Sequence, residues 1–184
     1  HAYTPSDMIV SDLPKDPSKD PYAGVALLLS PRVLRAVKEG GRSGCVGTRI
    51  VWVRFTARTK TYTIVGVYMP TMTRKAPTHN EVLQELQKFL QTIPKRDCVI
   101  VLGDMNVQLP RLTPGVTGKY ARRLNKKQTK KAMPMINMMR EQRLWAASTS
   151  RKPKRGRTGA TYIPFNKSYQ PTQIDYTLIT TKHK

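Results

Sequence analysis

The amino-acid sequence predicts an α/β layered domain built on a mixed sheet. Short runs of β-branched and aromatic residues indicate strands, and segments with apolar residues at helical spacing separate some of them. Two neighbouring strand-like runs are joined by a short polar turn, as in an antiparallel hairpin, whereas others are separated by a helix, as in a crossover. The length of 184 residues fits one domain, expected to span residues 1–184.

The first three predicted strands are residues 23–29 (AGVALLL), 49–56 (RIVWVRFT) and 61–69 (TYTIVGVYM). A polar stretch, TARTKT at residues 56–61, lies between the second and the third. These two strands should therefore pair as an antiparallel hairpin.

The clearest helix spans residues 81–93. Thr78 and Glu81 provide a capping box at its start, and Pro94 follows its end. Its apolar side chains recur at helical spacing on one face, which should lie against the core: Val82, Leu83, Leu86, Phe89, Leu90 and Ile93.

A second helix is predicted at about residues 133–142, with Pro134 in its first turn and Met135, Ile136 and Met139 toward the core. The remaining predicted strands are residues 98–102, 144–147, 160–163 and 173–180. The chain contains no internal repeat, so a repeat architecture is excluded.

The charge of the chain points to a polyanionic partner. Lys and Arg number 33 against 11 Asp and Glu, which gives a formal net charge of +22. Such an excess predicts strong attraction to nucleic acid. No apolar stretch approaches the roughly 20 residues of a membrane span, so no membrane partner is expected.

Two basic segments carry most of this excess, one within residues 111–131 and one at residues 151–157. They are predicted to bind nucleic acid, because the chain has too few acids to supply countercharges. Their cations are Lys119, Arg122, Arg123, Lys126, Lys127, Lys130 and Lys131 in the first segment, and Arg151, Lys152, Lys154, Arg155 and Arg157 in the second.

The two cysteines suggest a reducing compartment. Cys98 lies in an apolar run and reads as a buried free thiol, and Cys45 lies in a Gly-rich stretch read as a turn. Neither a disulfide framework nor a metal cluster is indicated. The chain begins with His1 rather than Met, so we expect a processed product or a fragment of something longer.

Three positions carry polar groups that could act on a phosphodiester. Asp104 and Asn106 follow the strand VIVL, two residues apart, which would place both side chains on one side of an extended strand end. Asp175 is a lone acid inside an apolar strand, so it should pair with a His or Arg. Tyr68 precedes Met69 and Pro70 at the end of another strand. Individually, each pattern is also explained by ordinary turn or packing roles.

Taken together and in this order, the runs GVALLLS, YTIVGVYMPT, VLGDMN and ATYIPF with QIDYTLI resemble the endonuclease/exonuclease/phosphatase superfamily. The nearest likeness is to the endonuclease domain of non-LTR (LINE-type) retrotransposons, which also encode a reverse transcriptase. The resemblance extends from about Ala23 to Ile179. It implies a four-layered α/β/β/α sandwich, here lacking terminal strands, with a phosphodiester-binding cleft at one edge.

The resemblance also implies roles for four residues and a cofactor. Family members cut phosphodiesters with a divalent cation, usually magnesium. By matching motif, Asp104 would orient or activate the water and Asn106 would bind the phosphate region. Asp175 would orient a catalytic His, and Tyr68 would approach the scissile phosphate.

The chain departs from the family pattern at both ends. The family's metal-binding Glu lies on a strand upstream of His1, and none of four acids stands in its place: Glu39, Glu81, Glu85 and Glu141. The family's closing Ser-Asp-His strand is also unmatched by the three histidines, His1, His79 and His183. We therefore assign no metal ligand, expect magnesium only if the site is functional, and expect the chain as given to be inactive.

Several functional interpretations follow from these patterns. The first is a nucleic-acid-binding domain derived from a magnesium-dependent endonuclease. The alternatives are a structural RNA-binding component of a ribonucleoprotein such as a ribosome, and an active retrotransposon DNA endonuclease seen as a fragment. A phosphatase of phosphorylated lipids explains the charge less well. Expected partners are structured RNA or DNA, with other proteins if a ribonucleoprotein is involved. The expected location is intracellular, in the nucleus or with a ribonucleoprotein, including one in an organelle.

Overall fold

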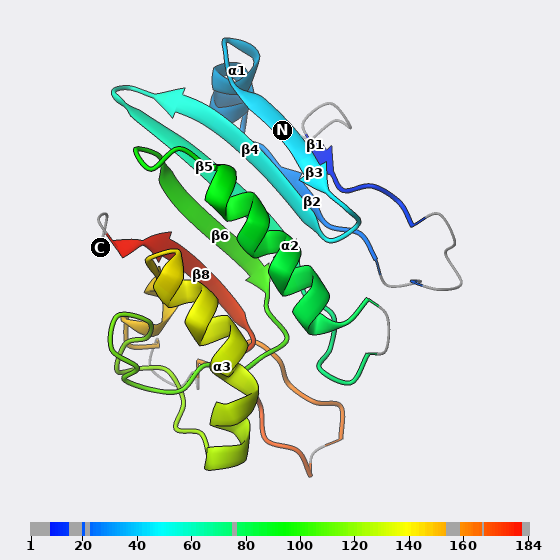
Figure 1. Cartoon of the computed structure of the whole chain (residues 1–184), viewed down its shortest axis with the longest axis vertical. Coiled ribbons are helices and arrows are strands. Elements are labelled where there is room, and N and C mark those ends of the chain that lie inside the picture. The colour runs from blue at the N-terminus through cyan, green and yellow to red at the C-terminus, as the bar shows by residue number, and fades with distance from the viewer. Residues whose placement is uncertain are drawn as a thin grey trace.

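A six-stranded mixed sheet organises the computed structural model, which describes residues 8–14, 20, 23–74, 77–153, 159–166 and 168–181 (Figure 1). The strands are β1 (Met8–Val10), β2 (Ala26–Leu28), β3 (Arg42–Val46), β4 (Ile50–Ala57), β5 (Lys60–Tyr68), β6 (Cys98–Asp104), β7 (Leu144–Ala146) and β8 (Asp175–Thr180). The helices are α1 (Pro31–Lys38), α2 (His79–Thr92), α3 (Lys126–Glu141) and a short 3-10 helix, η2 (Ala147–Thr149).

The large sheet has the strand order β3-β4-β5-β6-β8-β7, and β1 pairs with β2 in a separate two-stranded sheet. Only β5 and β6 pair in parallel within the large sheet, and the chain between them passes through α2. The other neighbours pair antiparallel. This mixed arrangement confirms the α/β class predicted from the sequence.

Alternating side chains send two hydrophobic clusters to opposite faces of the large sheet. On the face covered by α2 and α3, residues such as Val65, Val101 and Leu178 join apolar residues of both helices in the larger cluster. On the other face, Val51 and Val53 pack with Leu27 of β2 and with apolar side chains of α1. Burial on both faces explains the apolar character of β4 and β5.

The predicted sandwich differs from the structure in how the second face is covered. Among the described residues, the second sheet consists of β1 and β2 alone, and α1 contacts β3 and β4 of the large sheet directly. Within these same residues, no helix is both long and apolar enough to cross a bilayer.

Several predicted elements are confirmed. β4 and β5 form the expected hairpin, with Ala57 opposite Lys60. The capping box of Thr78 and Glu81 is present at the start of α2. Cys98 is a buried thiol that is not in a disulfide, as predicted.

Other predictions are wrong. The sequence reading missed β1, α1 and β3, and residues 160–163 form only an isolated bridge at Tyr162 instead of a strand. α3 begins at Lys126, seven residues before the predicted start of 133, so Pro134 lies inside the helix and not in its first turn. Cys45 lies in β3 rather than in a turn.

The predicted helix starts later than α3 for a physical reason. Asn125 and Gln128 form a capping box, which satisfies backbone N–H groups that would otherwise lack partners at the start of α3. The lysines that follow it are helical and exposed, so they add no apolar periodicity from which the first two turns could have been predicted.

Gly103 allows β5 and β6 to approach closely at the end of the pair. Its φ is 140°, and a Cβ added there would lie 1.9 Å from the Val67 carbonyl oxygen. Only glycine fits this conformation and this contact, so Gly103 fixes how β6 ends at Asp104.

We predict that Gly103→Ala destabilises the fold by at least about 2 kcal/mol, because it adds a steric clash to backbone strain of about 1–3 kcal/mol. Urea unfolding would measure the change. Gly115→Ala is the matched control, since its φ is 72° with no atom within 4 Å of the added Cβ. Equal losses in the two variants would contradict a specific role for the Gly103 contact.

Candidate functional site

Three of the four predicted site residues lie in one row across three adjacent strands. Tyr68 of β5 is the register partner of Asp104 of β6, and Asp104 is the register partner of Asp175 of β8. Register partners point to the same face of a sheet, here the face opposite α2 and α3. The structure therefore brings together a phenol and two carboxylates that are distant in the sequence.

The fourth residue, Asn106, closes the turn after β6. The Asn106 backbone N–H donates to Asp104 Oδ1 at 2.7 Å, and its side-chain Nδ2 donates to the Met69 carbonyl oxygen at 2.7 Å. Its φ of 46° is left-handed, so the predicted extended path from Asp104 to Asn106 is wrong. The amide instead ties this turn to the chain that leaves β5.

The two carboxylates of the row affect each other electrostatically. Burial raises the pKa of the Asp104 carboxyl above its ordinary value, and the negative charge of Asp175 raises it further. The Asn106 N–H bond opposes both effects. Asp104 thus holds its negative charge at a cost that a nearby cation would reduce.

Within the described residues, Asp175 lacks the cationic partner that the sequence suggested. Its carboxylate forms no salt bridge there, and its register partner on β6 is Asp104. Asp175 is half-buried and stands at the first position of β8 rather than inside the strand. Its backbone N–H donates to Thr161 Oγ1 at 3.1 Å.

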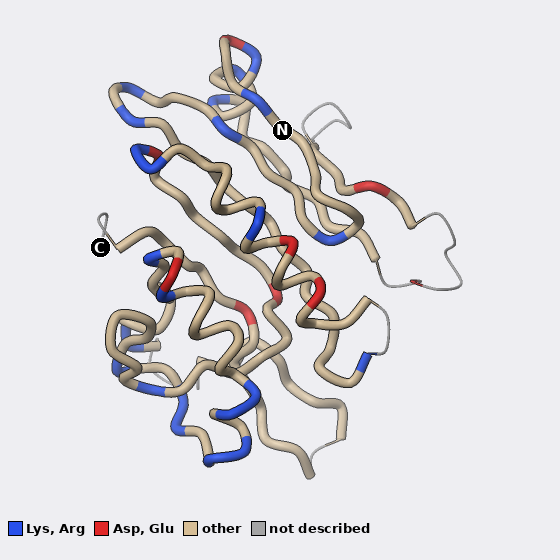
Figure 2. Tube along the Cα trace, in the orientation of Figure 1, with Lys and Arg blue, Asp and Glu red and all other residues tan. Residues whose placement is uncertain are grey.

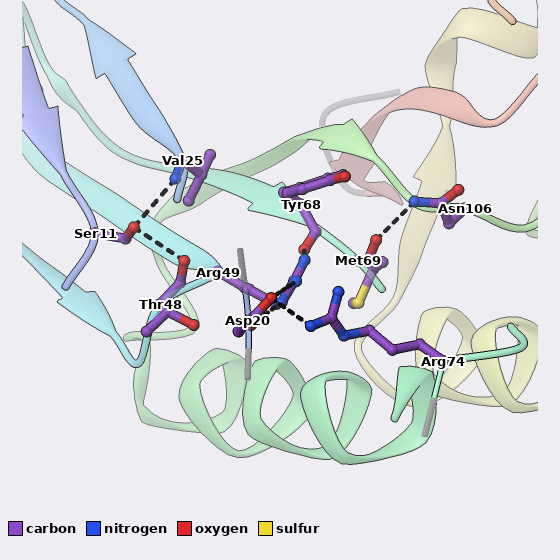
Figure 3. A network of polar contacts seen from close by, with 9 residues as sticks. All are labelled: Ser11, Asp20, Val25, Thr48, Arg49, Tyr68, Met69, Arg74 and Asn106. Carbon is purple, nitrogen blue, oxygen red and sulfur yellow. Dashed lines mark hydrogen bonds and ion pairs between the residues drawn. The ribbon is translucent and has the colours of Figure 1, made fainter. Parts of the chain in front are cut away.

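A buried arginine that the sequence analysis did not select supports Tyr68 (Figure 3). Arg49 is 2% exposed, donates to the Tyr68 carbonyl oxygen at 3.2 Å, and lies 4.9 Å from the centre of the Tyr68 ring. Its other nitrogens donate to both Asp20 oxygens, at 3.2 and 2.6 Å, and Arg74 reaches Asp20 at 2.8 Å. Two guanidiniums on one carboxylate leave a surplus positive charge beside Tyr68.

His79, the first residue of α2, holds the turn that carries Asp104 and Asn106. It is 5% exposed, and its Nε2–H donates to the carbonyl oxygen of Met105, which lies between Asp104 and Asn106. Burial lowers the pKa of the imidazole, and its Nδ1 has no hydrogen-bond partner in the described part of the chain. Neutral His79 therefore acts as a fixed donor to this turn rather than as a group facing solvent.

The sequence contained only weak signals for these supporting residues. Asp20 was visible as one of few acids in a basic chain, and His79 as the first helical residue after a capping threonine. Nothing local indicated that Arg49 would meet both Asp20 and Tyr68, because that contact depends on tertiary pairing.

The first basic segment lies at the same end of the sheet as the row. The cations of residues 119–131 occupy the loop before α3 and its first turns, near the end of the molecule where β6 ends (Figures 1 and 2). Their side chains are exposed, except that of Arg122, which is half-buried. Among the described residues, none of them forms a salt bridge with Asp or Glu.

The second basic segment is described only in part. Arg151 and Lys152 are exposed directly after η2. The other predicted cations of this segment, Lys154, Arg155 and Arg157, lie outside the described residues, as do His1 and His183.

The donor set of the row fits a hard divalent cation. Carboxylate and amide oxygens are what magnesium prefers, and it commonly uses one or two carboxylates with waters and phosphate oxygens. Asp104, Asp175 and the Asn106 carbonyl would be these donors. The described residues contain no group of three or more His, Cys, Asp or Glu that could hold a metal by themselves.

Comparisons by sequence give a limited match. No family model matches the chain. It is 31% identical over 100 residues to craniofacial development protein 2 of Bos taurus, and 29% identical over 100 residues to that of Tragulus javanicus. Each match covers 53% of this chain, and the chain spans only 16% and 17% of the lengths of these curated relatives.

Comparison with solved structures identifies the fold. The chain is similar to the endonuclease domain of TRAS1, a telomere-specific non-LTR retrotransposon, with a TM-score of 0.58 and 14% identity over 96% of this chain and 68% of that one. A weaker likeness, with a TM-score of 0.43 and 14% identity over 72% of this chain and 42% of that one, is to an endonuclease/exonuclease/phosphatase family protein of Leptotrichia buccalis. The fold is that of the endonuclease/exonuclease/phosphatase proteins, as the resemblance of the motifs implied.

We predict that Asp175→Asn lowers the pKa of Asp104, because it removes the adjacent negative charge. The folded-state pKa of Asp104 is raised, so its contribution to stability is present at low pH and lost as the pH rises through that pKa. Asp175→Asn should therefore raise the free energy of unfolding, relative to the unchanged chain, more at neutral pH than at pH 3.

NMR titration of the carboxyl groups would report the pKa of Asp104. Urea unfolding at neutral pH and at pH 3 would measure the stability. Glu39→Gln is the matched control, since it removes the same charge at an exposed position after α1. An unchanged Asp104 titration in Asp175→Asn would show that the two carboxylates are not coupled.

Proposed function

We propose that this chain, with its endonuclease/exonuclease/phosphatase fold, is a nucleic-acid-binding domain derived from a magnesium-dependent endonuclease. The observation that carries the proposal is the row of Tyr68, Asp104 and Asp175 at the same end of the sheet as a basic segment that forms no salt bridge within the described residues. The domain is taken as residues 1–184, with residues 111–131 and 151–157 as its basic nucleic-acid-binding segments. An intracellular location, in the nucleus or with a ribonucleoprotein, is part of the same proposal.

The basic segments would supply most of the affinity. Each lysine or arginine that neutralises a phosphate releases counterions, a gain that does not depend on base sequence. The exposed cations at the start of α3 have no carboxylate partners among the described residues, so a phosphate would not have to displace one.

The row would position one phosphodiester of the bound strand. The Tyr68 phenol and the Asn106 amide are groups that hydrogen-bond phosphate oxygens, whereas the two carboxylates repel them. Magnesium held by Asp104 and Asp175 would remove that repulsion and polarise the phosphate. The surplus positive charge of Arg49 and Arg74 beside Tyr68 favours an anion at the same place.

Cleavage is a second candidate function, and one observation favours it. Asp104 has a raised pKa and lies directly opposite Asp175, which is the environment in which a carboxylate accepts a proton from water. Holding structured RNA without cutting it, as in a ribonucleoprotein, is the corresponding non-catalytic role.

We predict that replacing Lys126, Lys127, Lys130 and Lys131 together by Gln flattens the salt dependence of nucleic-acid binding. The slope of log K against log salt should fall by about 0.9 for every one of these lysines that contacts a phosphate of a duplex. Fluorescence anisotropy between about 50 and 200 mM salt would measure it.

The matched control removes four exposed cations elsewhere. Changing Arg32, Arg35 and Lys38 of α1 and Lys60 at the start of β5 to Gln gives the same change in net charge at the opposite end of the sheet. This control should leave the slope nearly unchanged. Equal flattening in both variants would show that only net charge matters and that the first basic segment is not the interface.

A plasmid-nicking assay with magnesium separates the two candidate functions. In the absence of magnesium, Asp104→Ala should leave binding intact or strengthen it, because the change removes a negative charge from the phosphate site. Magnesium-dependent nicking by the unchanged chain that disappears in Asp104→Ala would establish cleavage. Tight binding of structured RNA without nicking would establish the non-catalytic role.

A further inference from the structure

A cavity of about 580 Å³ lies between the start of α3 and an extended arm, which we define as residues 159–166 and 168–172. This volume falls within the range of about 300–1,000 Å³ that is usual for small-ligand sites. It shares Arg122 and Arg123 with the first basic segment, but no residue of the row lines it. The residues that line it and matter for the argument are Gln108, Arg122, Arg123, Gln128, Tyr162 and Tyr169.

The chemistry of the lining is unusual for a solvated loop. It contains two arginines and no acid, so it selects an anion. It also contains two tyrosines that are 50% and 67% exposed, Tyr162 and Tyr169, whose ring faces are therefore accessible. Aromatic rings of this kind are the platforms on which unstacked bases bind.

Side-chain amides complete the lining. Gln128 Oε1 already accepts the Asn125 backbone N–H at 3.0 Å, so its NH₂ group is the part that remains to donate to a ligand. Gln108 is half-buried on the opposite wall. Donors and acceptors of this type suit the edge of a nucleobase.

The arm is held in place at its base. The Thr161 and Tyr162 N–H groups donate to the Thr172 carbonyl oxygen, each at 2.9 Å, and the Thr172 N–H donates back to Tyr162 at 2.8 Å. Thr161 Oγ1 accepts the N–H groups of Ile174 and Asp175, each at 3.1 Å. The tyrosines are thus positioned relative to β8.

Short chain segments join the cavity to the row. Gln108 follows Asp104 by four residues, and Thr172 precedes Asp175 by three, so these lining residues lie within about 14 Å of the row. A strand whose phosphate lies at the row would therefore have a nucleotide one or two positions away that could reach the cavity. The arginines would contact its phosphate, and the tyrosines its base.

We propose that this cavity binds an unpaired nucleotide of a nucleic-acid strand, with its base against Tyr162 or Tyr169 and its phosphate at Arg122 and Arg123. The inference rests on the proposed function and deepens it, because it names single-stranded character as what the site recognises. In a paired duplex the base faces are covered by their neighbours, so the tyrosines could not stack on them.

The test compares a blunt duplex with the same duplex carrying a short single-stranded extension, by fluorescence anisotropy. The full chain should bind the extended duplex more tightly. Tyr162→Ala and Tyr169→Ala should each weaken that binding by between about 5-fold and 100-fold while leaving blunt-duplex binding unchanged. Tyr162→Phe and Tyr169→Phe should restore it, since they keep the ring.

Phe165→Ala is the matched control, because Phe165 belongs to the same arm and is fully exposed without lining the cavity. Single-stranded extensions of RNA and of DNA would show which nucleic acid the cavity prefers. Binding of the free mononucleotide would also be measured. If it bound as tightly as the extension, the cavity would be a free-nucleotide site and the proposal would be overturned.

Other outcomes also decide the matter. No preference for the extension, or an equal effect of Phe165→Ala, would overturn the cavity proposal while leaving the proposed function standing. If the unchanged chain bound neither the blunt nor the extended duplex, this would instead refute the proposed function. Thermal unfolding of each tyrosine variant would confirm that the change acts on the ligand and not on folding.

Discussion

At the end of β6, the Gly103 backbone lies against the Val67 carbonyl oxygen, closer than any residue with a Cβ would allow. The candidate site depends on this contact, because it sets the last step of the parallel pairing of β5 with β6. Tyr68 and Asp104 then fall in register, and the antiparallel partner β8 adds Asp175 to the same row. The supporting contacts of Arg49 and His79 hold the two chain segments that leave this end of the sheet.

The positive net charge of the molecule and the negative charges of the row act on a polyanion in different ways. A net charge of +22 acts over distances of about a Debye length and attracts a polyanion without positioning it. The row is locally negative, so attraction by the basic segments and repulsion by Asp104 and Asp175 act on the same strand. In the proposed function, a divalent cation would resolve this conflict at a single phosphate. The location of binding would then be governed by a small acidic site within a strongly basic surface.

Elements with local causes could be predicted from the sequence, and elements with tertiary causes could not. The β4–β5 hairpin follows from a short polar turn, and α2 from its apolar periodicity and the capping box at Thr78. α1 was missed although Ser30 caps it, Pro31 begins it and its apolar residues recur at helical spacing, because its eight residues make only about two turns. The alignment of Tyr68, Asp104 and Asp175 depends on register between strands far apart in the sequence. Their residue types could be predicted, but their common row could not.

The bond between the Asp175 N–H and Thr161 Oγ1 joins the arm directly to the row. A ligand that shifts the arm must stretch this bond or move the start of β8, and a cation that draws Asp175 toward Asp104 acts on the same bond from the other side. If the proposed sites are occupied, linkage would make the two events reciprocal: whatever factor the cation contributes to affinity at the arm, the ligand would contribute to affinity for the cation. One hydroxyl group would then couple the proposed metal binding to the proposed strand binding.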